Sequence, residues 1–308
     1  MGTISIILCS HNGERLLPDT LDSLAALDLP SPTQLILVDN ASTDRTWEIL
    51  QRPFERFDVI RLQEPRRGKS LALNLALERA AGDLIVFTDD DTTRDPDWLT
   101  AYLDAGTHHP EALCFAGQVR PNWSATPARW QEYIADHGGA FGCSKISFND
   151  RVQPIDASQV KGANFAIRGA ARALRFDTER LNYGQEGAGG EDTHFASRAG
   201  DLGHPILFVP DAVVRHLIEP EDMSIGSVLG RTRSIGRSRW QRLRLQGEPP
   251  ELELRRARRR FRKAVKNIFR SRSRPEMVFW LLKAVFWRAQ IKEARNEAAT
   301  PAASAETP

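Results

Sequence analysis

The chain has 308 residues, of which 41% are hydrophobic and 27% charged, a composition typical of a globular protein that buries a large core. Its three cysteines are widely spaced, which excludes a disulfide framework and a cysteine-rich zinc site and favours a reducing cytoplasm. The formal net charge is only +2, but residues 231–295 hold 21 Lys and Arg against 5 Asp and Glu, or +16, leaving −14 for the rest. A basic segment of this size is typical of proteins that bind the phosphates of anionic lipids or of nucleic acid.

The amino terminus carries no basic leader, and its first residues form a short apolar run. We therefore expect it to open the fold as a strand rather than to be a signal peptide. No apolar run in the sequence reaches the ~20 residues that a membrane-spanning helix needs.

Four apolar stretches near the start of the chain predict β-strands: residues 4–9, 35–38, 59–62 and 84–88. Stretches of helical periodicity or high alanine content follow the first three and predict helices: 15–27, from 47 onward, and 71–81. Strands that alternate with helices imply crossover connections and a largely parallel sheet covered on both faces. The predicted fold class is therefore α/β.

Polar side chains follow the end of each predicted strand: Asn12 and Glu14, then Asp39, then Lys69, then Asp89, Asp90 and Asp91. Ligands of open α/β sheets bind beyond the carboxyl ends of the strands, so we expect these residues on one rim. Three adjacent carboxylates repel one another unless a cation or hydrogen-bond donors neutralise them. A divalent metal that also holds diphosphate oxygens would do so. The alternative is a turn whose acids cap the helix that follows near Trp98.

The middle of the chain contains three further features. Residues 113–121 and 205–214 predict strands, the second an edge strand because it contains Pro210. Residues 160–168 predict a strand with small residues that allow close approach to its backbone. A glycine-rich run at 187–190 leads to Glu191 and Asp192 at the start of a predicted helix, where these acids would serve a site or merely cap the helix.

Four of these blocks together resemble the family 2 glycosyltransferases of the GT-A fold. They are Ile-Ser-Ile-Ile-Leu-Cys-Ser-His-Asn-Gly at 4–13, Leu-Val-Asp-Asn-Ala-Ser-Thr-Asp at 37–44, Gly-Lys-Ser-Leu-Ala-Leu-Asn at 68–74 and Phe-Thr-Asp-Asp-Asp at 87–91. The resemblance covers roughly residues 3–240 and implies a mostly parallel nucleotide-binding sheet flanked by helices.

The resemblance also implies roles for the donor side of the site. Asp39 would recognise the nucleotide base, while Ser10, Asn12 and Glu14 would line the nucleoside pocket. Asp89 and Asp91, with Asp90 between them, match the Asp-x-Asp pair that contacts the ribose and, through a divalent metal, the diphosphate. Lys69 would join them. The basic segment 231–239 lies where this family closes over the diphosphate, and guanidinium groups match phosphate oxygens. Charge density alone does not choose between Arg231, Arg233 and Arg237, and Arg237 is taken as the candidate.

On the acceptor side, Asp192 would be the general base, with Glu191 beside it. Gly162 and Asn164 match a Gly-x-Asn-x-x-x-Arg element near the acceptor and the donor sugar, with a bulged buried strand as the alternative. His216 follows a predicted strand where metal-dependent members of this fold often supply a histidine. The metal would be Mn²⁺ or Mg²⁺ on Asp91 and His216, and neutral imidazole suits Mn²⁺ better.

We expect the whole chain to divide into three segments: a glycosyltransferase domain over 1–240, a basic helical extension over 241–295 and a disordered tail over 296–308. Within the extension, Met277–Trp287 is apolar over 11 residues and flanked by Arg and Lys. This pattern predicts an interfacial helix that gives residues 255–292 a peripheral membrane contact. The alternative is a helix docked on the catalytic domain. Nucleic-acid binding is not expected, because no recognition motif accompanies the charge.

The sequence thus predicts an inverting, metal-dependent glycosyltransferase that acts in polysaccharide or glycolipid biosynthesis in the cytoplasm, at the inner face of the cell membrane. Its donor would be a nucleotide-diphospho-sugar, with a UDP-sugar favoured, and its acceptor a saccharide or a lipid-linked sugar. A sugar nucleotidylyltransferase is one alternative, although residues 10–13 lack the glycine-rich, Arg-containing loop of that class. The other is a non-enzymatic module that binds membrane or nucleic acid.

Overall fold

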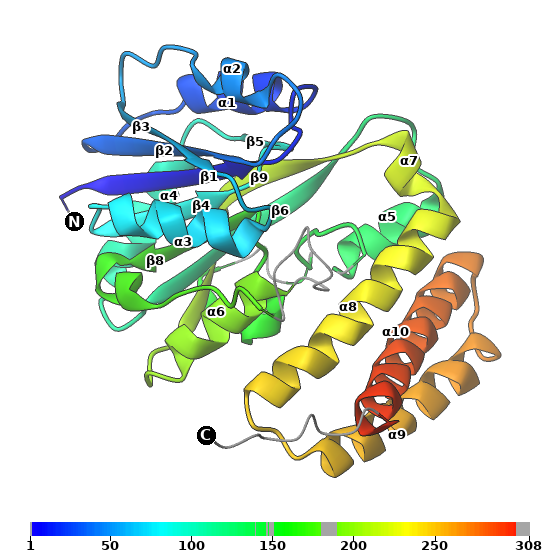
Figure 1. Cartoon of the computed structure of the whole chain (residues 1–308). Helices are drawn as coiled ribbons and strands as arrows, with labels where there is room; N and C mark the ends of the chain where they lie inside the picture. Colours follow the sequence, from blue (N-terminus) through cyan, green and yellow to red (C-terminus); the bar gives the residue numbers. More distant parts are fainter. Residues whose placement is uncertain (1, 139, 146, 148–150, 180–189, 300–308) are drawn as a thin grey trace.

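The structure, a computed structural model, describes residues 2–138, 140–145, 147, 151–179 and 190–299. Within these residues a nine-stranded mixed sheet is flanked by helices, and three long helices lie to one side of it (Figure 1). The strand order is β3-β2-β1-β4-β8-β6-β9-β5, with β7 paired to β9. This architecture confirms the predicted α/β fold with a helical carboxyl-terminal extension.

The strands are β1 (Ile4–Ser10), β2 (Thr33–Asn40), β3 (Asp58–Glu64), β4 (Leu84–Thr88), β5 (Thr92–Arg94), β6 (Cys114–Trp123), β7 (Gln153–Pro154), β8 (Asn164–Arg168) and β9 (Ile206–Ile218). The helices up to the end of the sheet are α1 (Leu17–Ala25), α2 (Thr46–Leu50), α3 (Lys69–Arg79), α4 (Trp98–His108), α5 (Arg129–Asp136), α6 (Glu191–Gly200) and α7 (Pro220–Met223). The three long helices are α8 (Ile225–Leu245), α9 (Pro250–Ile268) and α10 (Arg274–Ala299).

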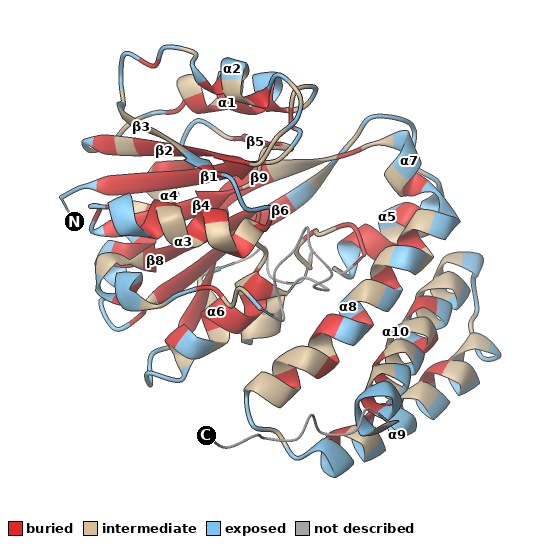
Figure 2. Cartoon of the chain, viewed as in Figure 1, coloured by how far each residue is buried: buried red, intermediate tan, exposed pale blue. Residues whose placement is uncertain are grey.

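Each face of the sheet carries its own core, because successive side chains of a strand point to opposite faces. In β1, Ile6 and Leu8 belong to the core that includes α1 and α4, whereas Ile7 and Cys9 belong to the core that includes α3 and α6. The central strands are therefore buried throughout (Figure 2). Burial on both faces explains why β1 reads as a continuous apolar run rather than as an alternating one.

The parallel arrangement predicted from alternating strands and helices holds for β3, β2, β1 and β4. The second half of the sheet is mixed, since β8 is antiparallel to both β4 and β6, while β6 and β9 are parallel. The four parallel strands end at one rim, and β8 begins there beside the end of β4.

The prediction of an edge strand at residues 205–214 is wrong. All of these residues except Pro205 lie in β9, which pairs with β6 on one side and with β5 and β7 on the other. Pro210 is tolerated because the register between β6 and β9 shifts there: Gly117 pairs with Val209, and Gln118 with Val213. A bulge leaves its extra residues outside the ladder, so the missing N–H of proline costs no ladder hydrogen bond.

The long helix α10 packs between α8 and α9 and also contacts α5 (Figure 1). Leu282 and Ala284 are buried, and Val278 and Phe279 pack against a core cluster that includes residues of α5. The apolar run Met277–Trp287 is therefore a docked helix, the alternative considered above, rather than a helix lying free for a headgroup layer. Among the described helices, none is long and apolar enough to cross a bilayer.

Two predicted boundaries differ from the observed elements. Helix α10 extends to Ala299, so the first residues of the predicted disordered tail are helical, while 300–308 lie outside the described residues. Glu297 helps to hold this end, because it accepts hydrogen bonds from Trp240 Nε1 at 2.5 Å and Arg244 Nε at 3.1 Å. The domain boundary placed at residue 240 falls inside α8 and stays a prediction.

Candidate active site

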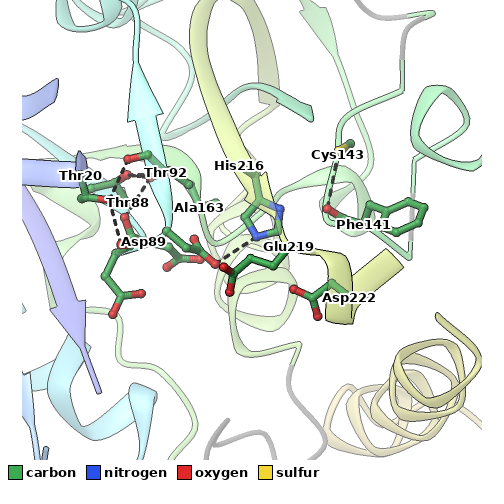
Figure 3. A network of polar contacts seen from close by, with 12 residues as sticks. Thr20, Thr88, Asp89, Thr92, Phe141, Cys143, Ala163, His216, Glu219 and Asp222 are labelled. Atoms are coloured by element: carbon green, nitrogen blue, oxygen red, sulfur yellow. Dashed lines mark hydrogen bonds and ion pairs between the residues drawn. The ribbon is translucent and has the colours of Figure 1, made fainter. Parts of the chain in front are cut away.

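Three acidic residues, Asp89–Asp91, follow β4 at the rim where the parallel strands end; we call them the acidic turn. Each acid pairs with a side chain from a different element: Ser10 of β1 donates a hydrogen bond to Asp90, Lys69 Nζ of α3 lies 2.5 Å from Asp89 Oδ1, and His216 Nε2 of β9 lies 3.1 Å from Asp91 Oδ2. Figure 3 shows His216 reaching from its strand toward this turn. The structure thus brings together residues that are up to about two hundred positions apart in the chain.

The buried guanidinium of Arg94 holds the backbone of the acidic turn through hydrogen bonds. Arg94 is 6% exposed and donates hydrogen bonds to the carbonyl of Asp89 at 3.2 Å, to the Thr88 hydroxyl at 2.5 Å and to the carbonyl of Thr92 at 3.0 Å. The Thr92 hydroxyl donates to the Asp89 carbonyl at 2.9 Å, within the threonine network of Figure 3. Burial lowers the pKa of Arg94 to about 9, against the opposing charges of Asp89 and Asp91. Sequence analysis missed this residue, because nothing local distinguishes it from a surface arginine.

The three acids avoid mutual repulsion in three ways. Burial, together with the charge of Asp91, raises the pKa of Asp90 to about 7, so Asp90 keeps its proton to a higher pH than an ordinary carboxyl does. Burial would raise the pKa of Asp91 as well, but the charge and hydrogen bond of His216 outweigh it and lower that pKa. Burial would lower the pKa of Lys69, but Asp89 and the acids of α6 outweigh it and raise that pKa, so Lys69 is a permanent counter-charge.

The chemistry of Asp91 and His216 fits a divalent cation. Asp91 Oδ1 is buried without a hydrogen-bond partner, although its carboxylate stays ionised beside the imidazole. Within the described part of the chain, no group of three His, Cys, Asp or Glu side chains forms a cation cage. Two protein ligands still suffice for a small divalent cation that keeps waters and takes its remaining ligands from substrate phosphates. Asp91 and His216 are therefore the residues that would hold the predicted Mn²⁺ or Mg²⁺.

The candidate base, Asp192, lies in the first turn of α6 and faces the same site. Its Oδ2 accepts a hydrogen bond from the backbone N–H of Gly162 at 2.7 Å, and its Oδ1 one from Thr193 N at 2.6 Å. A Cβ placed on Gly162 would lie 3.5 Å from Asp192 Oδ2 and 3.5 Å from Lys69 Nζ. Asp192 Oδ2 and Lys69 Nζ are therefore no more than twice that distance apart, and Gly162 lies next to both.

Glu191, next to the candidate base, is 6% exposed, and its Oε2 has no hydrogen-bond partner among the described residues. Burial, together with the charge of Asp192, raises the pKa of Glu191 to about 7. Helix α6 begins after Gly190, which is left-handed at φ 91°, so the two acids start the helix as the sequence predicted. The glycines before it, 187–189, lie outside the described residues.

The loops after β1 and β2 are joined where the nucleoside pocket is predicted. Asn12 Oδ1 accepts a hydrogen bond from Thr43 N at 2.8 Å, and Glu14 pairs with Arg45 at 2.5 Å. Asp39, 5% exposed at the end of β2, accepts a hydrogen bond from Ser42 N at 3.2 Å. Asn12 and Glu14 thus shape the wall of the rim through internal contacts.

Residues 5–175 match the sequence profile of the family described as Glycosyl transferase family 2, which is more than half of the chain. The chain belongs to Glycosyl transferase family 2. This membership confirms the family and the glycosyltransferase activity that the four sequence blocks predicted.

Relatives of this glycosyltransferase are named for different biosynthetic roles. It is 28% identical over 226 residues to the succinoglycan biosynthesis protein ExoM of Rhizobium meliloti, which covers 71% of this chain and 68% of ExoM. It is 24% identical over 169 residues to the glucosyl-dolichyl phosphate glucuronosyltransferase of Haloferax volcanii, covering 54% of this chain and 52% of that protein.

Solved structures share the fold of this glycosyltransferase. The mannosyltransferase PcManGT of Pyrobaculum calidifontis, in complex with GDP-Man and Mn²⁺, aligns with a TM-score of 0.56 at 20% identity, covering 99% of this chain and 76% of that one. A fragment of S. aureus TarS aligns with a TM-score of 0.55 at 16% identity, with the same two coverages.

Two predicted site residues form no hydrogen bond or ion pair with the acidic turn in the part of the chain that the structure describes. Asn164 is fully buried, and all four hydrogen bonds of its amide are made within the protein, which leaves none for a sugar. Arg237 is exposed on α8 and pairs with no acid of the described residues, so its assignment stays a prediction.

Two cations near the base were missed by the sequence analysis. Burial lowers the pKa of Lys161, and Asp192 is the charge that most opposes this shift. Burial and the charge of Arg239 lower the pKa of Arg242, again with Asp192 opposing. Lys161 precedes Gly162 directly, which is the only sequence signal that would have found it.

Proposed function

We propose that this glycosyltransferase moves a sugar, with inversion, from a nucleotide-diphospho-sugar to a hydroxyl of a saccharide or lipid-linked acceptor in polysaccharide or glycolipid biosynthesis. The observation that carries the proposal is the position of Asp192, which is held by the Gly162 N–H and lies near Lys69, the lysine that pairs with Asp89 of the acidic turn. A carboxylate that is fixed beside a diphosphate-binding rim is placed to accept a proton from an attacking hydroxyl.

The donor would bind along the rim. Asp39, at the end of β2, would meet the base, and Lys69 with the acidic turn would hold the diphosphate. Asp91 and His216 would hold the divalent cation, which when bound neutralises the charge of the departing diphosphate. We favour a UDP-sugar, since structures of TarS in complex with UDP and UDP-GlcNAc share the fold.

Asp192 would act on the acceptor. It takes the proton of the acceptor hydroxyl while the oxygen forms a bond to the anomeric carbon, and the bond from that carbon to the diphosphate oxygen breaks on the opposite face. Lys69, which stays protonated, offsets the charge that develops on the leaving diphosphate. Because its pKa is raised to about 7, Glu191 is protonated over a wider pH range than an ordinary carboxyl, and in that form it adds no second negative charge beside the base.

The test is a panel of nucleotide sugars incubated with the protein and Mn²⁺, Mg²⁺ or a chelator, with nucleoside diphosphate and pyrophosphate measured separately. We expect a nucleoside diphosphate from one donor, only with a divalent cation present. Release of pyrophosphate would instead identify a sugar nucleotidylyltransferase, and no release from any donor would favour a non-enzymatic module. Asp192→Asn should abolish turnover of that donor if Asp192 is the base. The matched control is Asp201→Asn, which replaces an exposed acid at the carboxyl-terminal end of the same helix.

We also propose that the enzyme works in the cytoplasm at the inner face of the cell membrane, where a lipid-linked acceptor would be presented. The basic carboxyl-terminal helices support this placement, because anionic headgroups attract clustered Lys and Arg.

A further inference from the structure

The face of α9 that points away from α10 is basic from Arg255 to Lys266, after a first turn that carries the exposed acid Glu251. The opposite face packs inward through a stripe of buried residues, Glu253, Ala257 and Ala264. The outward face carries six exposed cations that form no ion pair with any described residue: Arg255, Arg258, Arg259, Arg262, Lys263 and Lys266. Figure 2 shows this helix at the periphery with exposed residues on its outer side.

The connection from α9 to α10 adds apolar side chains to this charge. Phe269, at the end of α9, is 85% exposed, the highest value among the large hydrophobic residues of the described chain. Exposed Arg270, Arg272 and Arg274 follow it. The first turns of α10 then contribute Met277, 42% exposed, and Leu281, 40% exposed. We call the outward face of α9, this connection and these two residues the α9 edge.

The composition of the α9 edge identifies the chemistry of its partner. Its cations complement a surface of many negative charges, and such a surface is offered both by anionic lipid and by nucleic acid. The apolar side chains decide between the two. Phe269, Met277 and Leu281 gain free energy when they enter hydrocarbon, whereas the aliphatic Met and Leu gain little against the hydrated phosphates of a duplex. A lipid surface satisfies both parts of the edge at once.

We propose that the α9 edge docks the protein on an anionic lipid bilayer, with Phe269 and its apolar neighbours inserted at the headgroup boundary and the arginines on the headgroup phosphates. This inference rests on and deepens the proposed function, because it gives the membrane location a defined surface. Helix α10 stays packed between α8 and α9, and of its side chains the exposed Met277 and Leu281 reach the lipid. The mode of binding is peripheral, and α9 lies along the surface instead of crossing it.

The test is co-sedimentation of the full chain with vesicles of phosphatidylcholine alone or of phosphatidylcholine with one-third phosphatidylglycerol. It uses no sugar donor, so its result is independent of donor hydrolysis in solution, which tests the proposed function. Two variants remove the two parts of the edge: Phe269→Ser with Met277→Ser, and Arg270→Gln with Arg272→Gln and Arg274→Gln. Leu202→Ser, at an apolar residue 56% exposed elsewhere, is the matched control. Thermal unfolding of each variant confirms that the fold is retained.

We expect binding to the anionic vesicles only. Each arginine removed should weaken it by about fivefold, since a basic residue near an anionic surface contributes about 1 kcal/mol. The apolar pair should weaken it by at least about tenfold, and the control should bind like wild type. Unchanged binding in both edge variants would overturn the proposal, and so would equal binding to neutral vesicles. Tighter retention by duplex DNA than by the anionic vesicles would assign the edge to nucleic acid instead.

Discussion

Replacing Asn164 by alanine tests whether this residue holds the site together or binds a sugar. Its amide oxygen accepts hydrogen bonds from Trp98 Nε1 at 2.8 Å and from Tyr102 Oη at 2.7 Å. Its amide nitrogen donates to the carbonyls of Gln118 at 2.9 Å and Ala212 at 2.7 Å. All of these bonds are inside the protein, at the junction of β8, β6, β9 and α4.

The magnitude follows from the groups that the substitution leaves unpaired. Asn164→Ala strands two buried donors and weakens the pairing of two carbonyls, and each buried group left unpaired costs about 1–3 kcal/mol. We expect the free energy of unfolding to fall by about 4 kcal/mol, measured as a lower urea midpoint at an unchanged denaturant slope. Tyr102→Phe removes one of the donors and is the graded control, with an expected loss of about 1 kcal/mol.

The opposite pattern would refute this reasoning. If Asn164→Ala unfolded at the same urea concentration as wild type yet transferred no sugar, Asn164 would contact the substrate, as the sequence resemblance implied. A loss of stability together with a proportional loss of active protein would agree with the structural role.

Three further predictions concern Glu191, two glycines and the divalent cation. The pKa of Glu191 in the folded protein, about 7, lies above its ordinary 4.5, so ionisation of Glu191 lowers the free energy of unfolding as the pH rises through that range. Glu191→Gln should therefore be more stable than wild type above pH 7, by up to about 3 kcal/mol in urea unfolding, and should match wild type below pH 4.5. Equal stability of the two proteins above pH 7 would contradict the assignment. A Cβ on Gly117 would clash with the Asn164 amide and the Ala212 carbonyl, so Gly117→Ala should lower the free energy of unfolding by about 1–3 kcal/mol. Gly230 lies inside α8 with open space around it, so Gly230→Ala should raise the free energy of unfolding by about 0.5–1 kcal/mol, because alanine loses less backbone entropy in a helix. Chelation of divalent cations should lower donor hydrolysis by at least about tenfold, with recovery on adding Mn²⁺, and hydrolysis that is indifferent to chelator would remove the cation from the mechanism.

Much of the rim was predictable from the sequence for a physical reason. Parallel strands bring their carboxyl ends to one edge, so polar residues after Ile4–Ser10, Thr33–Asn40 and Leu84–Thr88 had to meet there whatever the details of packing. The start of α6 at Glu191 followed from its glycine and its paired acids in the same local way. Family 2 membership could be predicted from the four sequence blocks named above, because these blocks contain the residues that form the rim.

What could not be predicted depends on contacts between distant segments. The pairing of β9 with both β6 and β5 makes Pro210 part of an interior bulge, and no local pattern reports which strands lie beside a given one. Arg94 acts by reaching beneath a turn, and Asn164 by joining three strands and a helix, so each looks ordinary in the sequence. The Met277–Trp287 run was similar: its apolar and basic pattern predicted a helix at a membrane surface, but the helix packs against α5, α8 and α9, with Leu282 and Ala284 buried and Met277 and Leu281 left exposed.

The most direct test of the central claim is calorimetric titration of UDP, with and without Mn²⁺, into wild type, Asp91→Asn and Asp192→Asn, alongside turnover of the donor found in the panel. We predict Mn²⁺-dependent binding to wild type, loss of that dependence in Asp91→Asn, and near-normal binding in Asp192→Asn with turnover reduced by about 10²–10⁴-fold. Binding that ignores Mn²⁺ in wild type, or an Asp192→Asn variant that turns over normally, would contradict the account.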